Sequence, residues 1–246
     1  MTEIDVAGLN ERFEDVEPIH ILEWASSKYG DRLKLACSLG AEDNVLTAML
    51  AEASSRASVF VLDTGRLNPE TYQTLSALRS RYGGLNFEVF FPNGESVERL
   101  MSLKGPFSFY DSVENRRECC GIRKVEPLRR ALATAEAWVT GLRRGQSVTR
   151  ANLPIFELDE DHGNILKINP LAGWTTDEVM AYARSKRVPL NPLHEKGYPS
   201  IGCEPCTRAI EPGEDLRAGR WWWESPDLKE CGLHVKGDLL IPNFQK

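Results

Sequence analysis

The sequence lacks the features that would place the protein in a membrane, on nucleic acid or in an export pathway. No apolar run approaches the length of a membrane span, and the N-terminal stretch is acidic and has no apolar core. The net charge of −6 has the wrong sign for a protein that binds nucleic acid phosphates. We therefore expect a cytoplasmic protein with no membrane or nucleic acid partner.

Two common nucleotide-binding motifs are also missing. The sequence has neither the G-x-x-x-x-G-K-[ST] pattern of P-loop proteins nor the G-x-G-x-x-G pattern of dinucleotide folds, and it has no internal repeats. The chain has 246 residues, of which 41% are hydrophobic and 27% charged, so the composition is that of an ordinary globular protein. One domain with an appendage, or two small domains, fits this length.

Short apolar segments alternate with helical patterns in the first part of the chain. Segments 32–37, 58–62, 87–91 and 137–140 are typical of buried strands, and helices are expected over 43–53 and from Asn68 onward. This alternation predicts a doubly wound, mainly parallel α/β sheet, in which ligands bind at the carboxyl ends of the strands.

The pattern changes after Asn169. Thr175 or Thr176 is expected to cap a helix that runs to about Arg187, and five prolines then interrupt the chain. We expect residues 1–212 to form a nucleotide-binding α/β domain and residues 213–246 to form an extended, mobile C-terminal tail.

Polar residues follow two neighbouring predicted strands. The loop from Ser38 to Asp43 leads from a strand into a helix, whose first N–H groups can bind an anion, and residues 62–65 repeat this arrangement. A plain turn in which Ser38 caps a helix is the alternative. The candidate nucleotide-binding residues here are Ser38, Gly40, Glu42, Asp43, Leu62, Asp63, Thr64 and Gly65.

Four of the six cysteines form two pairs, Cys119-Cys120 and the C-x-x-C of Cys203 and Cys206. Two pairs of thiolates suggest either zinc or an iron–sulfur cluster. Adjacent residues on a helix project about 100° apart, so their sulfurs diverge, which favours the separate iron corners of a cluster over a single zinc ion. An inert buried pair is the alternative for Cys119 and Cys120.

A basic segment surrounds the first cysteine pair. If residues 117–125 are helical, Lys124 lies on the face of Cys120 and can reach a bound anion. Further guanidinium groups suited to phosphate or sulfate come from Arg143, Arg144, Arg150, Arg217 and Arg220. A solvated basic face is the alternative. Trp221 to Trp223 could cover a base or anchor the tail.

The remaining two cysteines have different settings. Cys37 ends an apolar strand and is expected to be a packed small side chain. Cys231 lies in the tail beside Lys229 and His234, where nearby cationic groups favour the thiolate. We expect Cys231 to be a redox-active nucleophile, although an incidental exposed thiol is possible on this sequence.

Together these segments resemble the assimilatory adenylylsulfate (APS) reductases, relatives of the PAPS reductases in the PP-loop, adenine nucleotide alpha-hydrolase-like superfamily. The resemblance extends from about Leu33 to His234. It implies that Cys119, Cys120, Cys203 and Cys206 hold a 4Fe-4S cluster, that Lys124 links cluster and substrate electrostatically, and that Cys231, with His234 nearby, is the nucleophile. The loop at Ser38 departs from the usual PP-loop, because Leu39 stands at a normally small position.

The resemblance implies a thioredoxin-dependent reduction of APS to sulfite and AMP through a Cys231 S-sulfonate, in sulfate assimilation and cysteine biosynthesis. Thioredoxin or a similar dithiol is the expected reductant, and we expect a homo-oligomer. Three alternatives remain, namely a PAPS reductase, another PP-loop iron–sulfur enzyme such as a tRNA thiolase, and a non-catalytic zinc-stabilised binding module.

Overall fold

The computed structural model describes residues 4–53, 55–147 and 150–225. At its centre is a six-stranded sheet in the order β3-β2-β1-β4-β6-β5, in which only the β5–β6 pair is antiparallel. The strands are β1 (Leu33–Ala36), β2 (Ser58–Leu62), β3 (Asn86–Phe90), β4 (Ala137–Val139), β5 (Phe156–Asp159) and β6 (Ile165–Ile168).

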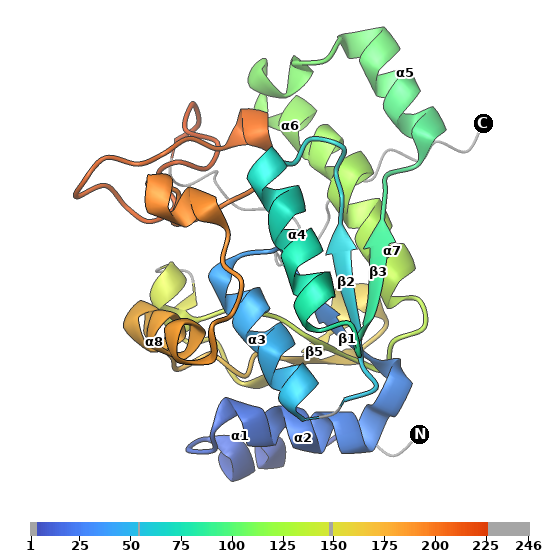
Figure 1. Ribbon diagram of the computed structural model, residues 1–246. Helices are drawn as coiled ribbons and strands as arrows, with labels where there is room; N and C mark the ends of the chain where they lie inside the picture. Colours follow the sequence, from blue (N-terminus) through green and yellow to red (C-terminus); the bar gives the residue numbers. More distant parts are fainter. Residues whose placement is uncertain (1–3, 54, 148–149, 226–246) are drawn as a thin grey trace.

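Helices cover both faces of this sheet, as Figure 1 shows. The larger apolar core joins the sheet to five helices on one face, and a smaller core around Phe60 and Trp138 joins it to α7 on the other. The helices are α1 (Val6–Phe13), α2 (Pro18–Tyr29), α3 (Ala41–Glu52), α4 (Pro69–Arg81), α5 (Gly94–Lys104), α6 (Val113–Cys120), α7 (Glu126–Leu132) and α8 (Thr176–Lys186). None of the helices in the described ranges is both long and apolar enough to cross a membrane.

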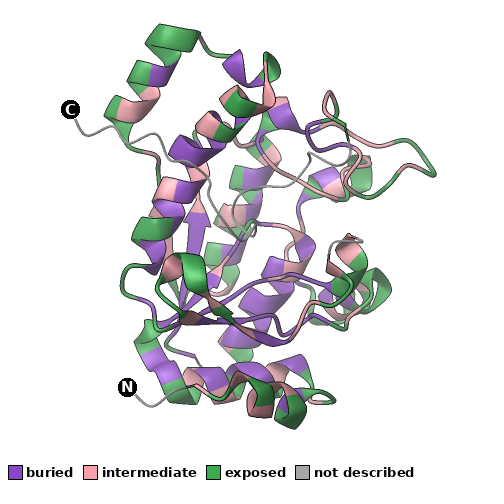
Figure 2. Cartoon of the chain, turned by 180° about the vertical axis from the view of Figure 1, so that it is seen from behind, coloured by how far each residue is buried: buried purple, intermediate pink, exposed green. Residues whose placement is uncertain are grey.

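The predicted parallel, doubly wound architecture is confirmed. All four predicted strands occur, and the central ones consist mainly of buried residues, shown in purple in Figure 2. Thr175 caps α8 in a capping box with Glu178, and the helix ends at Arg187 in a left-handed conformation. The antiparallel hairpin of β5 and β6 was not predicted.

The direction of winding reverses between β1 and β4, which are adjacent in the sheet although β2 and β3 lie between them in the chain. The loops after these two strands therefore separate and leave a crevice at their carboxyl ends. A close contact across the crevice fixes its width, because a Cβ atom at Gly141 would collide with the carboxylate of Asp43. The fold thus places the loop at Ser38 opposite the loop at Gly141.

Residues 217–224 return to the main body beside the cysteines. Trp221 is buried, and its backbone N–H donates to the carbonyl of Cys206. The guanidinium of Arg116 lies 4.6 Å from the centroid of the Trp221 ring. Nε of Arg116 also donates to Glu224 at 2.6 Å, and both side chains are almost fully buried. Residues 217–224, which lie in the segment predicted to be a mobile tail, are therefore packed into the domain.

We predict that Glu224→Ala lowers the free energy of unfolding by about 3–5 kcal/mol, because it leaves the Arg116 charge buried opposite an empty position. Glu118→Ala, on the same helix as Arg116, is the matched control. It breaks a partly exposed pair with Lys104 and should cost about 0–1 kcal/mol. Urea denaturation measures both values. Equal losses of unfolding free energy would contradict the larger contribution to stability that we assign to the buried pair.

Candidate functional site

A cavity of about 570 Å³ lies at the carboxyl ends of β1, β2 and β4. This volume is in the range of small-molecule and cofactor sites, and the position is the one expected for a doubly wound sheet. Of the residues predicted from the sequence, the cavity wall contains Ser38, Gly40, Glu42, Asp43, Leu62, Thr64, Lys124, Cys203, Arg143, Arg150, Arg217 and Arg220.

The loop after β1 is held by the carboxylate of Asp43. Both the N–H and the hydroxyl of Ser38 donate to Asp43, at 2.7 and 2.5 Å. Leu39 takes a left-handed conformation with φ of 66°, and α3 then begins with no side chain capping its first N–H groups. Those N–H groups face the cavity end of the helix and can receive an anion.

Burial changes the acidity of Asp43. Loss of hydration raises the pKa of this carboxyl group to about 6, although the hydrogen bonds from Ser38 and the Gly141 backbone act in the opposite direction. Asp43 thus links the two loops of the crevice, since it accepts hydrogen bonds from Ser38 in one loop and from the Gly141 backbone in the other.

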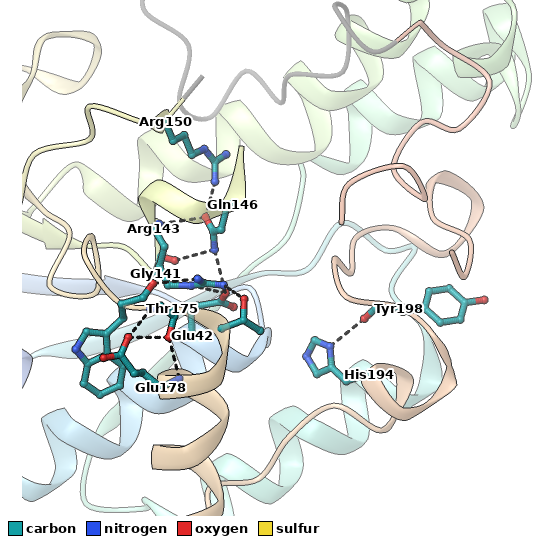
Figure 3. A network of polar contacts seen from close by, with 11 residues as sticks. Glu42, Gly141, Arg143, Gln146, Arg150, Thr175, Glu178, His194 and Tyr198 are labelled. Carbon is teal, nitrogen blue, oxygen red and sulfur yellow. Dashed lines mark hydrogen bonds and ion pairs between the residues drawn. The ribbon is translucent and has the colours of Figure 1, made fainter. Parts of the chain in front are cut away.

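Figure 3 shows a polar network in the wall next to this loop. One oxygen of Glu42 accepts hydrogen bonds from Arg143 at 2.7 and 2.9 Å and from Gln146 at 3.0 Å. Gln146 in turn accepts a hydrogen bond from Arg150 at 2.6 Å. Arg143 is only 3% exposed and already carries an ionic partner, so its position is fixed before any ligand arrives.

The loop after β2 connects the cavity to the cysteines. Asp63 accepts hydrogen bonds from the Gly65 N–H at 2.8 Å and the Tyr72 hydroxyl at 3.0 Å. The carbonyl of Thr64 accepts a hydrogen bond from Arg123 at 2.6 Å, and its hydroxyl lies 3.2 Å from Cys203 Sγ. Asp63 and Gly65 therefore shape the turn, whereas Thr64 itself lines the cavity.

All four paired cysteines come together. Cys119, Cys120, Cys203 and Cys206 are buried in one cluster and line a second, small cavity of about 20 Å³. Burial raises the pKa of the Cys206 thiol to about 12 and also raises that of Cys119. Arg66, Arg116, Arg123 and Lys124 line the same cavity, and cations beside a buried thiol favour its thiolate form.

The four thiols are a possible donor set for a metal centre. In the parts of the chain that the structure describes, no group of three or more His, Cys, Asp or Glu side chains has the geometry of a metal-ion site. Four thiols around one cavity are a donor set for iron–sulfur clusters, whose ligands bind separate irons.

A π-helical turn positions Lys124 between the two cavities. The segment Gly121–Val125 forms this turn between α6 and α7, and Pro127 lies in the first turn of α7, as predicted. π-Helical turns are rare in proteins as a whole, but those that occur often lie at functional sites. Lys124 lies in the π-helical turn and lines both the large cavity and the cysteine cavity.

Other predicted residues lie elsewhere. Arg144 is exposed, donates to the carbonyl of Leu153 and is not part of the large cavity's wall. Cys231 and His234 lie outside the described residues. Cys37 is fully packed at the end of β1, and burial raises its pKa. Gln146 and His194 line the large cavity but were not predicted, because single polar residues in loops carry no motif.

Comparison with known proteins agrees with this geometry. The family defined by the phosphoadenosine phosphosulfate reductase domain matches residues 32–209. The chain belongs to this family. The match covers the sheet, all four paired cysteines and most of the residues that line the two cavities, so the resemblance seen in the sequence is confirmed.

Individual members of the family are similar over most of the chain. An adenosine 5′-phosphosulfate reductase of Burkholderia cepacia is 56% identical over 86% of this chain and 84% of its own length. One from Allochromatium vinosum is 54% identical over 83% and 79%. The crystal structure of a phosphoadenylyl-sulfate reductase from Candida auris, a phosphate complex, has a TM-score of 0.72 and 26% identity, covering 85% of this chain and 99% of that one.

A more distant structure shares the fold alone. FMN adenylyltransferase from Candida glabrata, solved with FAD and pyrophosphate, has a TM-score of 0.55 and 13% identity, covering 100% of this chain and 86% of that one. The doubly wound sheet therefore also occurs in this adenylyltransferase.

The raised pKa of Asp43 predicts a pH dependence of stability. Between about pH 4 and pH 6 the folded protein keeps a proton on Asp43 that the unfolded chain has released. Raising the pH through this window therefore lowers the free energy of unfolding, by up to about 3 kcal/mol, relative to Asp43→Asn. Urea denaturation at a series of pH values tests this, and parallel curves for both proteins would contradict it.

Proposed function

We propose that this chain reduces adenosine 5′-phosphosulfate to sulfite and AMP, as the names of its bacterial relatives describe for those proteins. The observation that carries the proposal is that Lys124 lines both a nucleotide-sized cavity and a cavity surrounded by four buried cysteines. A nucleotide site alone would suit many enzymes. Its direct connection to a thiol-rich centre suits a reaction at sulfur.

We propose that Cys119, Cys120, Cys203 and Cys206 hold a 4Fe-4S cluster. The four-thiol donor set and the surrounding cations support this assignment, because thiolates bind iron only when deprotonated. When bound, the cluster would join α6 to the C-x-x-C loop and hold the thiolates in their charged form. The remaining steps are derived from the side chains of the chain itself.

The nucleotide carries its negative charges into a wall of guanidinium and ammonium groups. Lys124, Arg217 and Arg220 line the cavity from two separate segments, and Arg150 lines it from the loop after β4. These cations lower the repulsion between a dianionic substrate and an approaching thiolate, and they stabilise the charge that builds up on the departing phosphate. The N-terminus of α3 supplies further donors.

Cys231 is the proposed nucleophile. Its thiolate attacks the sulfur of the sulfate group, a sulfur–sulfur bond forms, the bond from sulfur to the phosphate oxygen breaks, and AMP leaves with the electron pair. A thiolate of thioredoxin or a similar dithiol then attacks the Cys231 sulfur and releases sulfite. Its second thiol resolves the mixed disulfide, so the dithiol is oxidised by two electrons while the substrate sulfur is reduced.

A PAPS reductase is the second candidate, since the family and the Candida auris structure carry that name. The relatives of higher identity are named APS reductases, which favours a substrate without a 3′-phosphate. Rates of sulfite release from both nucleotides separate the two functions. A cytoplasmic location and a homo-oligomeric state stay predictions.

Mass spectrometry after incubation with APS and no reductant tests the intermediate. We expect a gain of one SO₃ group on the peptide that contains Cys231, and no gain in Cys231→Ser. Cys37→Ser is the matched control and should still gain the SO₃ group on the Cys231 peptide, because the Cys37 thiol is buried. Sulfite release at the wild-type rate by Cys231→Ser would end the proposed mechanism.

Visible absorption and iron content test the cluster. Cys203→Ser should lose the iron–sulfur absorbance, since it removes one of the four ligands. Cys37→Ser should retain it. Full iron content in Cys203→Ser, or a colourless zinc-containing wild type, would show that the ligand assignment is wrong.

A further inference from the structure

His194 has a buried nitrogen with no hydrogen-bond partner. The residue lies in the short helical segment Pro192–Lys196 after α8 and lines the large cavity. In the described part of the chain, its Nε2 is covered by protein atoms and contacts no donor or acceptor. An unpaired buried nitrogen costs free energy, so a site that retains one calls for a partner that the protein itself does not supply.

The other ring nitrogen determines what kind of partner that is. Nδ1 of His194 lies 2.9 Å from the carbonyl oxygen of Tyr198, a contact visible in Figure 3. A carbonyl oxygen can only accept a hydrogen bond, so Nδ1 must carry the proton. In the neutral ring, Nε2 then has a lone pair and accepts.

An accepting nitrogen selects against the charged part of the substrate. Phosphate and sulfate oxygens are acceptors and would face this lone pair without a proton between them. The nucleoside part of the substrate does carry donors, in its ribose hydroxyls and in the 6-amino group of adenine. The cations of the wall are suited to the charged groups and His194 to the nucleoside.

The segment that carries the ring is anchored to the rest of the domain. The neighbouring Asn191 is buried, donates to the Thr71 hydroxyl at 3.0 Å and accepts from the Leu193 N–H at 3.1 Å, which anchors the segment to α4. Because protein atoms cover Nε2, a ligand reaches it only when the ring or its cover moves, and side-chain rearrangement at a site is common on binding.

We propose that Nε2 of His194 accepts a hydrogen bond from the nucleoside of the bound substrate, which makes His194 a nucleotide-binding residue. The inference rests on the proposed function and extends it by assigning one wall of the cavity to the uncharged end of the nucleotide. If the donor is the 3′-hydroxyl, a 3′-phosphate would place an acceptor against this nitrogen. The same residue would then favour APS over PAPS.

Binding of AMP to the full-length protein with its cluster tests the proposal. His194→Asn can keep an N–H for Tyr198 but has no group at the Nε2 position, and we expect it to bind AMP about tenfold more weakly. His194→Gln can return an amide oxygen to that position and should recover part of the affinity. His162→Asn is the matched control, because its ring pairs with Asp159 and is not part of the cavity wall.

Analogues of AMP identify the donor and separate a direct contact from a structural effect. The arms are 2′-deoxy-AMP, 3′-deoxy-AMP and purine riboside 5′-monophosphate, which each lack one donor. Wild type should bind one of them about tenfold more weakly than AMP, and His194→Asn should lose nothing further with that analogue. Equal losses by His194→Asn with AMP and all three analogues would overturn the proposal.

The experiment distinguishes a failure of this inference from a failure of the proposed function. If wild type binds AMP and reduces APS while His194→Asn binds AMP with wild-type affinity, His194 is excluded and the function stands. If wild type binds no AMP, the proposed function fails as well.

Discussion

The contact between the π-helical turn and the loop after β2 is the constraint on which the site depends. The guanidinium of Arg123 donates to the carbonyl of Thr64, and the hydroxyl of Thr64 lies beside Cys203. Through these two contacts the helix that carries Cys119 and Cys120 is joined to the sheet and to the C-x-x-C loop. A cysteine centre and a nucleotide cavity share a wall because these three segments meet at one residue.

Several cations line the two cavities although the protein as a whole has a net negative charge. Some of them already have an ionic partner, since Arg143 is paired with the partly buried Glu42 and Arg116 with the buried Glu224. Such groups hold loops in place and contribute little net field toward a ligand, because their partners cancel much of their charge. Lys124, Arg217 and Arg220 are the cations of the cavity wall that lie on segments touching the cysteine cluster. Arg143 and Arg116 are therefore scaffold cations, because each is held by a carboxylate of the protein itself.

The sequence predicted the sheet and the cysteine cluster because both depend on patterns that local physics imposes. Buried strands must be apolar, and a donor set for a cluster needs several thiols. It did not predict β5 and β6, since Glu157, Asp159 and Lys167 interrupt their apolar pattern, and one ion pair, Lys167 with Glu157, crosses the hairpin. Nor could it show that Asp63 shapes a turn or that Arg144 faces away from the cavity, because a side chain's direction depends on tertiary contacts. The π-helical turn has no local signature either.

Two adjacent cysteines at the end of α6 belong to one cluster of buried thiols. Their side chains leave the α-helix about 100° apart. Both are nevertheless buried in the same cluster as the two cysteines of the C-x-x-C loop. The π-helical turn that follows contains an extra residue, which changes the direction in which the chain leaves α6. Within this turn Arg123 donates to Thr64, and Lys124 lines both cavities. The irregular turn thus lies where the cysteine pair, the contact with the sheet and the lysine of both cavity walls meet.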